Sequence, residues 1–287
     1  MKITDKSYQA TGHPCFICDY SPARSGDPNQ VDQADIDADM IAVAYNPGRA
    51  VRANSAMLAS AIKSRLGREA SFTLATRDMN KLAMESHLLG AQLLDLENVI
   101  VVQGDPFSQR DLERTKEAGD QLPTQLIAAI TSLNQGLDFR GSQLRGPTDF
   151  CIGATVDLDR PSKQEAALAH RKVRAGAHFL ITQPIFDPSQ AAAFEEAYAA
   201  VAGQSLNLPV FYGLQVLEQD GVIFSTVPGA VREELAQGKP GVQIALDLYQ
   251  RLIDAGLHDV YLVPPIRRGG ARSYNAAREF LSGAGSR

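Results

Sequence analysis

Short apolar runs alternate with longer amphipathic segments along the whole chain. Most of the runs are apolar throughout, which is typical of strands that are covered on both faces. We therefore expect a parallel sheet with helices packed on its outer side. The predicted strands are Cys15–Tyr20, Met40–Tyr45, Ser71–Thr76, Asn98–Val102, Phe150–Ala154, His178–Thr182, Pro209–Leu214 and Asp259–Val263.

The segments between these runs carry start and stop signals for helices. Leu58, Ile62 and Leu66 share one helical face, Asn54 is placed to cap its amino-terminal end, and Gly67 is placed to end it. Two later segments, 161–176 and 240–256, begin at a proline and close at a glycine, the expected asymmetry of helix ends.

The number of predicted strands indicates the architecture. Eight strands alternating with helices close naturally into a (β/α)8 TIM barrel, which needs about 250 residues, so the 287 residues fit a single barrel domain over 1–287. An open doubly wound sheet would show a G-x-G-x-x-G turn after its first strand, but residues 21–26 are Ser-Pro-Ala-Arg-Ser-Gly. The stretch 106–145, between the fourth and fifth strands, is the most irregular and is long enough to include a lid.

Charge and hydropathy exclude several classes of partner. Charged residues make up 21% of the chain, both signs are mixed, and the formal net charge is −5, which argues against a nucleic-acid partner. The amino-terminal residues lack an apolar targeting segment and no window approaches 18 apolar residues, so we expect a cytoplasmic protein without a membrane partner. The oligomeric state is left open, a homo-oligomer included.

Cysteine and histidine chemistry is not favoured. Cys15 and Cys18 form a C-x-x-C, but on a strand they face opposite sides, so we expect both to be structural. His178 and His258 fall at strand starts, the stability end of a barrel. We therefore expect neither a histidine metal site nor a serine–histidine–aspartate arrangement.

In a barrel, chemistry is expected just beyond the carboxyl end of each strand. Asp19 ends the first strand and Asp105 follows the fourth; either carboxyl can serve as a general acid or stabilise a cation, or merely cap a turn. The other polar residues predicted at this rim are Tyr45, Asn46, Arg77, Asp78, Gln103, Gly104, Thr155, Gln183 and Gln215. Arg267-Arg268-Gly269-Gly270 follows the last strand and is either a phosphate site or a solvated turn.

At these positions the chain resembles the methylenetetrahydrofolate reductase family. The Gly104-Asp105 pair after the fourth strand and the run Ile181-Thr182-Gln183-Pro184-Ile185-Phe186-Asp187 are the most specific matches. Further matching segments lie at 19–24, 75–80, 88–91 and 171–177.

The resemblance implies an enzyme that moves hydride between NAD(P)H, a flavin (FAD) and 5,10-methylenetetrahydrofolate, giving 5-methyltetrahydrofolate. It implies that Asp19 takes the place of the family's glutamate general acid, one methylene shorter. Asp105 would contact folate and the flavin, and Gln183 would recognise the pterin, with Gln215 also at the substrate. Tyr45, Gly104, Thr155 and Lys172 would lie at the flavin.

Some residues depart from the family pattern. Gln103 stands where family members have Arg or Thr, Ala44 replaces a threonine, Thr73 replaces a histidine, and Glu165 stands where an aspartate is usual. Folate residues are thus better matched than flavin residues. Two alternatives stay open: a flavin-independent reductase that uses the nicotinamide cofactor directly, and a non-catalytic folate-binding partner subunit.

Overall fold

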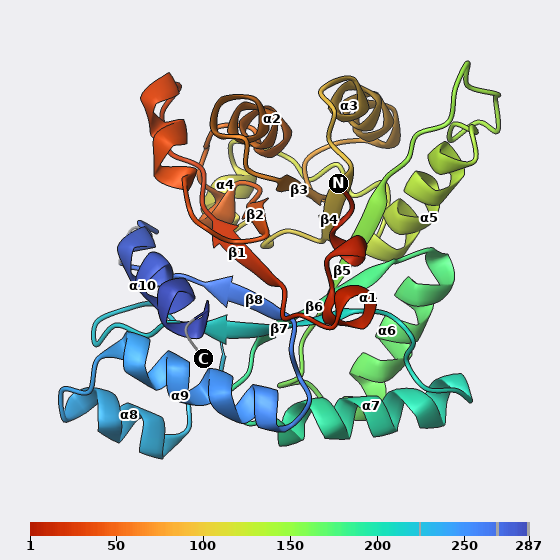
Figure 1. Cartoon of the computed structure of the whole chain (residues 1–287). Coiled ribbons are helices and arrows are strands. Elements are labelled where there is room, and N and C mark those ends of the chain that lie inside the picture. Colours follow the sequence, from red (N-terminus) through yellow and green to blue (C-terminus); the bar gives the residue numbers. More distant parts are fainter. Residues whose placement is uncertain (224, 268–269, 286–287) are drawn as a thin grey trace.

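The computed structural model describes residues 1–223, 225–267 and 270–285. Its eight strands form a closed parallel barrel in which each strand pairs with the next and β8 pairs with β1 (Figure 1). The strands are β1 (Phe16–Tyr20), β2 (Met40–Val43), β3 (Ala70–Ala75), β4 (Asn98–Val102), β5 (Cys151–Val156), β6 (Phe179–Pro184), β7 (Val210–Gln215) and β8 (Val260–Val263). The predicted TIM barrel is confirmed, and each apolar run overlaps its strand.

Helices surround the barrel on its outer side (Figure 1). The longer ones are α2 (Ser55–Leu66), α3 (Lys81–Leu93), α5 (Pro123–Asn134), α6 (Ser162–Ala175), α7 (Ser189–Ala202), α9 (Gly241–Asp254) and α10 (Tyr274–Gly285). Shorter ones are α1 (Tyr8–Thr11), α4 (Gln109–Leu112), α8 (Gly229–Ala236) and three 3-10 turns, η1 (Ile3–Asp5), η2 (Pro28–Ala34) and η3 (Pro47–Arg49). Over the described ranges, we find no helix with the length and apolarity that a membrane crossing requires.

The cap signals of α2 act as predicted. The Asn54 side chain accepts hydrogen bonds from the backbone N–H groups of Ala56 and Met57 at 3.0 and 3.2 Å. Gly67 closes the helix with a φ of 63°, a left-handed conformation that glycine adopts without strain.

The expectation of an irregular stretch at 106–145 is wrong for its middle. Helix α5 occupies 123–134 and buries Leu126, Ile127 and Ile130 completely. Pro123, which looks like a loop signal, is the first residue of the helix, where its missing N–H costs nothing. The helical spacing of Leu126, Ile127, Ile130 and Leu133 predicts this helix, but the turn-forming residues on either side of the segment obscured that pattern.

The core has two layers. A larger cluster lies between strands and helices, and a smaller one fills the barrel, where Ile17, Ile100, Phe179 and Phe211 meet. Gly153 belongs to the wall of this interior: a Cβ there would lie 2.4 Å from Cζ of the Phe179 ring. The sheet therefore has room for Phe179 only because its neighbour on β5 has no side chain.

The two cysteines of the C-x-x-C are both buried and belong to different clusters. Cys15 lies with the barrel interior and Cys18 lies in the strand–helix layer. The prediction that their sulfurs diverge is confirmed.

The amino-terminal segment covers the end of the barrel where the strands begin. Ile3 is fully buried in the interior cluster, and its N–H donates to Oδ1 of Asn98 at 2.9 Å. Asp259, just before β8, accepts hydrogen bonds from the N–H groups of Tyr8 (2.8 Å) and Cys15 (3.2 Å). This end of the barrel is thereby closed, and the opposite mouth is left for the polar rim.

Candidate active site

Asp19 lies in the inner layer of the open mouth. Ile17 belongs to the interior cluster, and side chains two positions apart on a strand face the same way, so Asp19 faces inward from the last part of β1. Its carboxylate accepts a hydrogen bond from the Tyr261 hydroxyl at 3.1 Å and forms an ion pair with Arg272, 3.0 Å from Nη2. The two charged side chains are only 9% and 5% exposed, so the pair is shielded from solvent.

The Tyr261 hydroxyl, which donates to Asp19, is buried as well. Tyr261 faces inward from β8, and its burial, followed by the nearby Asp19 charge, raises its pKa well above the ordinary value. The hydroxyl therefore stays protonated and serves as a fixed hydrogen-bond donor to Asp19. Desolvating an ion pair costs free energy that the attraction between the charges often fails to recover, so stability alone is a weak explanation for this pair.

A cavity of about 510 Å³ opens between β4, β5 and β6. Gln103, Thr155 and Gln183 line it from the strand ends, while α6 contributes Lys172 and Arg171. A volume of this size is ordinary for a cofactor or substrate pocket. Three of the residues that the family resemblance selected, Thr155, Lys172 and Gln183, thus share one cavity, whereas Asp19 and Asp105 are not among its lining residues.

A β-bulge exposes Gln183 to this cavity. Ile181 is paired with Phe211, but Pro184 is paired with Gly213, so β6 carries one residue more than β7 over this interval. The Gly213 N–H donates to the Thr182 hydroxyl at 2.8 Å. Bulges at barrel rims re-aim side chains, and here the amide of Gln183 is exposed while its neighbours Thr182 and Pro184 are buried.

Lys172 is the buried cation of the cavity. Its ammonium group donates to the Thr155 carbonyl oxygen at 2.5 Å. Burial lowers its pKa, and the Glu165 carboxylate partly opposes that shift. Glu165 is itself buried and accepts the N–H of Asp157 at 3.1 Å, so the residue that departs from the family's aspartate is built into the cavity wall.

Asp105 lies on the loop after β4, and its side chain is exposed. One carboxylate oxygen accepts the N–H of Gly48 at 3.2 Å, and its carbonyl accepts Nη1 of Arg77 at 2.6 Å. The preceding Gly104 has a φ of 87°, and a Cβ there would lie 3.2 Å from Cβ of Ala75. Both constraints favour glycine, so this residue sets the path of the backbone that carries Asp105.

Other predicted rim residues are already engaged within the protein. Gln215 is buried and donates to the Val222 carbonyl oxygen at 2.8 Å, which holds the loop after β7. Tyr45 is half-buried, and burial, with the Asp78 charge as a further cause, raises its pKa to about 12. The Arg267 guanidinium is paired with Glu218 at 3.1 Å, whereas Arg268 and Gly269 lie outside the described residues.

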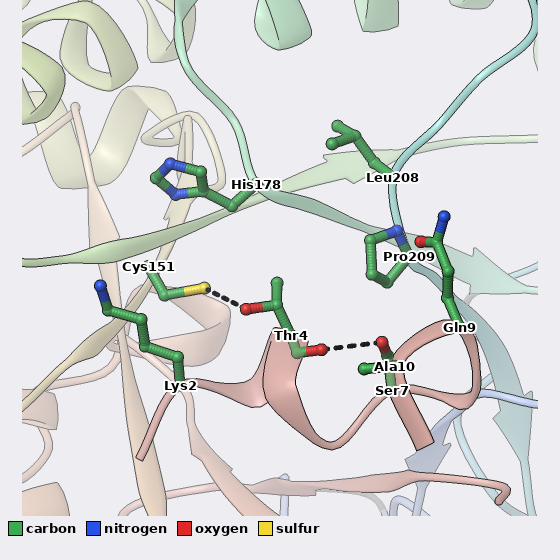
Figure 2. Close-up of a pocket in the computed structure, with 9 residues that line it drawn as sticks. All are labelled: Lys2, Thr4, Ser7, Gln9, Ala10, Cys151, His178, Leu208 and Pro209. Carbon is green, nitrogen blue, oxygen red and sulfur yellow. Dashed lines mark hydrogen bonds between the residues drawn. The ribbon is translucent and has the colours of Figure 1, made fainter. Parts of the chain in front are cut away.

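The opposite end of the barrel has a pocket of about 370 Å³ lined by Thr4, Cys151 and His178 (Figure 2). The Thr4 hydroxyl and Cys151 Sγ are 3.8 Å apart, and Nδ1 of His178 accepts the Ile152 N–H at 2.9 Å. His258 stacks on Tyr8 with ring centroids 3.7 Å apart. The placement of His178 and His258 at the stability end, as predicted, is confirmed.

The closed barrel, with a buried charged pair and a polar cavity at its carboxyl mouth, is a TIM barrel, a class whose active sites lie at that mouth. The methylenetetrahydrofolate reductase family model matches residues 29–264, and the chain belongs to that family.

A solved structure is also similar. It is described as an uncharacterized protein from Clostridium thermocellum that binds two copies of 5-methyl-5,6,7,8-tetrahydrofolic acid. The TM-score is 0.65 at 10% sequence identity, with 96% of this chain and 97% of that chain covered. At this identity the likeness concerns the fold.

Sequence reasoning missed the two partners of Asp19. Tyr261 occupies an inward position of β8, and its polar group inside an apolar strand was a usable signal. Arg272 comes from the loop between β8 and α10, where no periodicity relates a residue to the mouth. Only the folded chain brings it to Asp19, 253 positions earlier.

Proposed function

We propose that this protein interconverts 5,10-methylenetetrahydrofolate and 5-methyltetrahydrofolate, with hydride supplied by NAD(P)H through a flavin. Family membership supports this reaction class, and the Clostridium thermocellum protein of the same fold binds the methylated folate. The observation that carries the proposal is the buried Asp19 carboxylate, held by Arg272 and Tyr261 at the mouth. A folate-binding subunit without catalysis has no need of an acid–base group in that place.

The folate would be held by side chains that offer both donors and acceptors. The Gln183 amide has a carbonyl and an amino group, which can complement the hydrogen-bonding edge of a pterin. Ring opening of the methylene compound creates a cationic one-carbon unit, and the Asp105 carboxylate can stabilise such a cation electrostatically. Gln215 would act indirectly, because its amide holds the loop at Val222.

Asp19 would handle the proton of ring opening. Its carboxyl group is one methylene shorter than glutamate, and Tyr261 and Arg272 fix its position. We therefore expect it to reach the folate nitrogen through one bridging water, donating a proton to that nitrogen as the ring opens and taking it back as the ring closes.

The cavity between β4, β5 and β6 fits a flavin nucleotide. Lys172, Arg171 and Arg160 give it cations for a phosphate group, and Thr155 and Gln103 give polar contacts at the strand ends. Gly104, on the loop after β4, would border the group, and Tyr45 would approach it from the end of β2. A bound flavin would supply a hydride acceptor and donor. Within the chain, Lys172 and the arginines would bind and orient it.

The test begins with the purified protein, with and without added FAD. We expect a flavin absorption spectrum and oxidation of NADH or NADPH that depends on 5,10-methylenetetrahydrofolate. A colourless protein with the same folate-dependent oxidation would favour the flavin-independent reductase. A protein that binds 5-methyltetrahydrofolate but never turns over would be the non-catalytic binding subunit.

The Asp19→Asn variant tests the acid–base role. We expect loss of turnover with folate affinity largely retained, because asparagine keeps the size and hydrogen-bonding oxygen but carries no titratable proton. The exposed Asp149, paired with Lys2 at the closed end, offers Asp149→Asn as the control that keeps activity. Unchanged turnover in Asp19→Asn would remove Asp19 from the mechanism.

A further inference from the structure

A second cleft lies at the same mouth, between the loops that follow β2, β3 and β4. It has a volume of about 300 Å³, and none of the residues assigned above to the folate or the flavin is among those that line it. Its charged lining consists of Arg49, Arg77, Arg114, Lys116, Asp78 and Asp111. Four cations face two carboxylates in a chain whose formal net charge is −5.

The carboxylates are each committed to one cation. Asp78 accepts two hydrogen bonds from Arg77, at 2.5 and 2.7 Å, and Asp111 lies 3.3 Å from Nε of Arg49. Arg114 and Lys116 are exposed and form no ion pair within the described parts of the chain. The cleft therefore holds two positive charges that no lining carboxylate compensates.

Two further carboxylates lie close by without lining the cleft. Asp105 accepts the Gly48 N–H at 3.2 Å, and Glu117 accepts the Phe107 N–H at 3.2 Å. Each thus stabilises a loop that forms a wall of the cleft.

The wall formed by the loop after β2 is strained. Asn46 and Arg49 have φ angles of 40° and 60°, a left-handed region that non-glycine residues rarely adopt. Arg49 is held to the loop after β4 by a hydrogen bond from Nη1 to the Pro106 carbonyl oxygen at 3.1 Å. Such conformations persist only where the surrounding structure holds them, and they are concentrated at ligand sites.

The opposite wall is preorganised as well. Arg77 is buried, its guanidinium lies 4.3 Å from the centroid of the Phe107 ring, and its carbonyl oxygen accepts the Ala118 N–H at 2.8 Å. These contacts fix the 107–118 segment that presents Arg114 and Lys116. Arg114 and Lys116 are therefore carried by a loop whose backbone is fixed by these contacts.

We propose that this cleft binds the 2′-phosphate of NADPH and so selects NADPH over NADH. A phosphate monoester carries about −1.5 to −2 charges at neutral pH, and Arg114 and Lys116, which form no ion pair in the described parts of the chain, can bind it. Arginine binds phosphate through paired N–H donors, and lysine adds a point charge. The inference rests on the proposed function for the identity of the nucleotide, while the cleft itself calls only for a phosphate dianion.

The test compares binding of NADPH and NADH to the full-length protein by nucleotide fluorescence. We expect tighter binding of NADPH, and in the double variant Arg114→Gln/Lys116→Gln a roughly tenfold rise in its Kd, about 1.4 kcal/mol. The Kd of NADH should change little. Inorganic phosphate should weaken NADPH binding to the unaltered protein and have no such effect on the double variant.

The double variant Lys163→Gln/Arg174→Gln is the matched control. It removes the same charge at two exposed side chains outside the cleft. Equal affinity of the unaltered protein for NADPH and NADH would overturn the proposal. An equal loss of NADPH affinity in both double variants, or phosphate binding to the cleft without NADPH binding, would overturn it as well. Selective NADPH binding without folate turnover would instead support the cleft while contradicting the proposed reaction.

Discussion

Replacing Asp259 by asparagine should change how the stability of the protein depends on pH. Asp259 lies at the closed end of the barrel, is 6% exposed, and accepts the N–H groups of Tyr8 and Cys15. Burial is the main cause that raises its pKa from 3.8 to about 6, against the opposing effect of the two backbone hydrogen bonds.

The sign of the effect follows from the two states of the chain. The folded pKa is higher than the unfolded one, so the fold favours the protonated carboxyl. The resulting stabilisation is complete below the unfolded pKa of 3.8 and is lost as the pH rises through about 6. Two pKa units correspond to about 3 kcal/mol, of which roughly 2 kcal/mol falls between about pH 4.5 and about pH 8.

Asparagine cannot ionise, and its side-chain oxygen can accept the same N–H groups. We therefore expect urea unfolding to show Asp259→Asn gaining about 2 kcal/mol relative to the unaltered protein on going from about pH 4.5 to about pH 8. Asp149→Asn, at an exposed carboxylate, should follow the unaltered protein throughout. If the two curves of Asp259→Asn and the unaltered protein run parallel, the reasoning about Asp259 is refuted.

Further predictions concern the interior and the cavity. Gly153→Ala should lower the free energy of unfolding by about 1–3 kcal/mol because the added Cβ would meet the Phe179 ring. Gly90→Ala on α3, where no atom lies near the added Cβ, should instead raise the free energy of unfolding by about 0.5–1 kcal/mol. Equal effects of the two variants in urea unfolding would contradict this. Lys172→Gln should weaken FAD binding, measured by fluorescence titration, and Lys163→Gln should leave it unchanged; retained affinity in Lys172→Gln would show that the flavin does not use this cavity.

The barrel was predictable because its strands carry their signal locally. Runs such as Asn98–Val102 are continuously apolar, and the eightfold alternation with helices leaves few architectures. The cap residues of α2 were equally local. Helix α5 was missed because its apolar spacing lies in a segment rich in turn residues, and element type there depends on burial against the barrel.

The site was predictable in its positions and only partly in its contacts. Strand ends located Asp19, Thr155 and Gln183, because parallel strands bring their carboxyl ends to one mouth. The partner of Asp19 could not be found, since Arg272 reaches it through the irregular chain after β8. The bulge at Gln183 was equally hidden, because it depends on the register between β6 and β7.

That bulge sets a limit on how this protein can change. Deleting one residue between Ile181 and Pro184 would restore an even ladder with β7 and leave the flanking side chains facing as they do now, but it would remove the bulge that exposes the Gln183 amide. The interior would keep Phe179, and the mouth would lose its exposed amide. The length of β6 is therefore constrained as tightly as its chemistry, and new specificities are easier to reach through the loops around it.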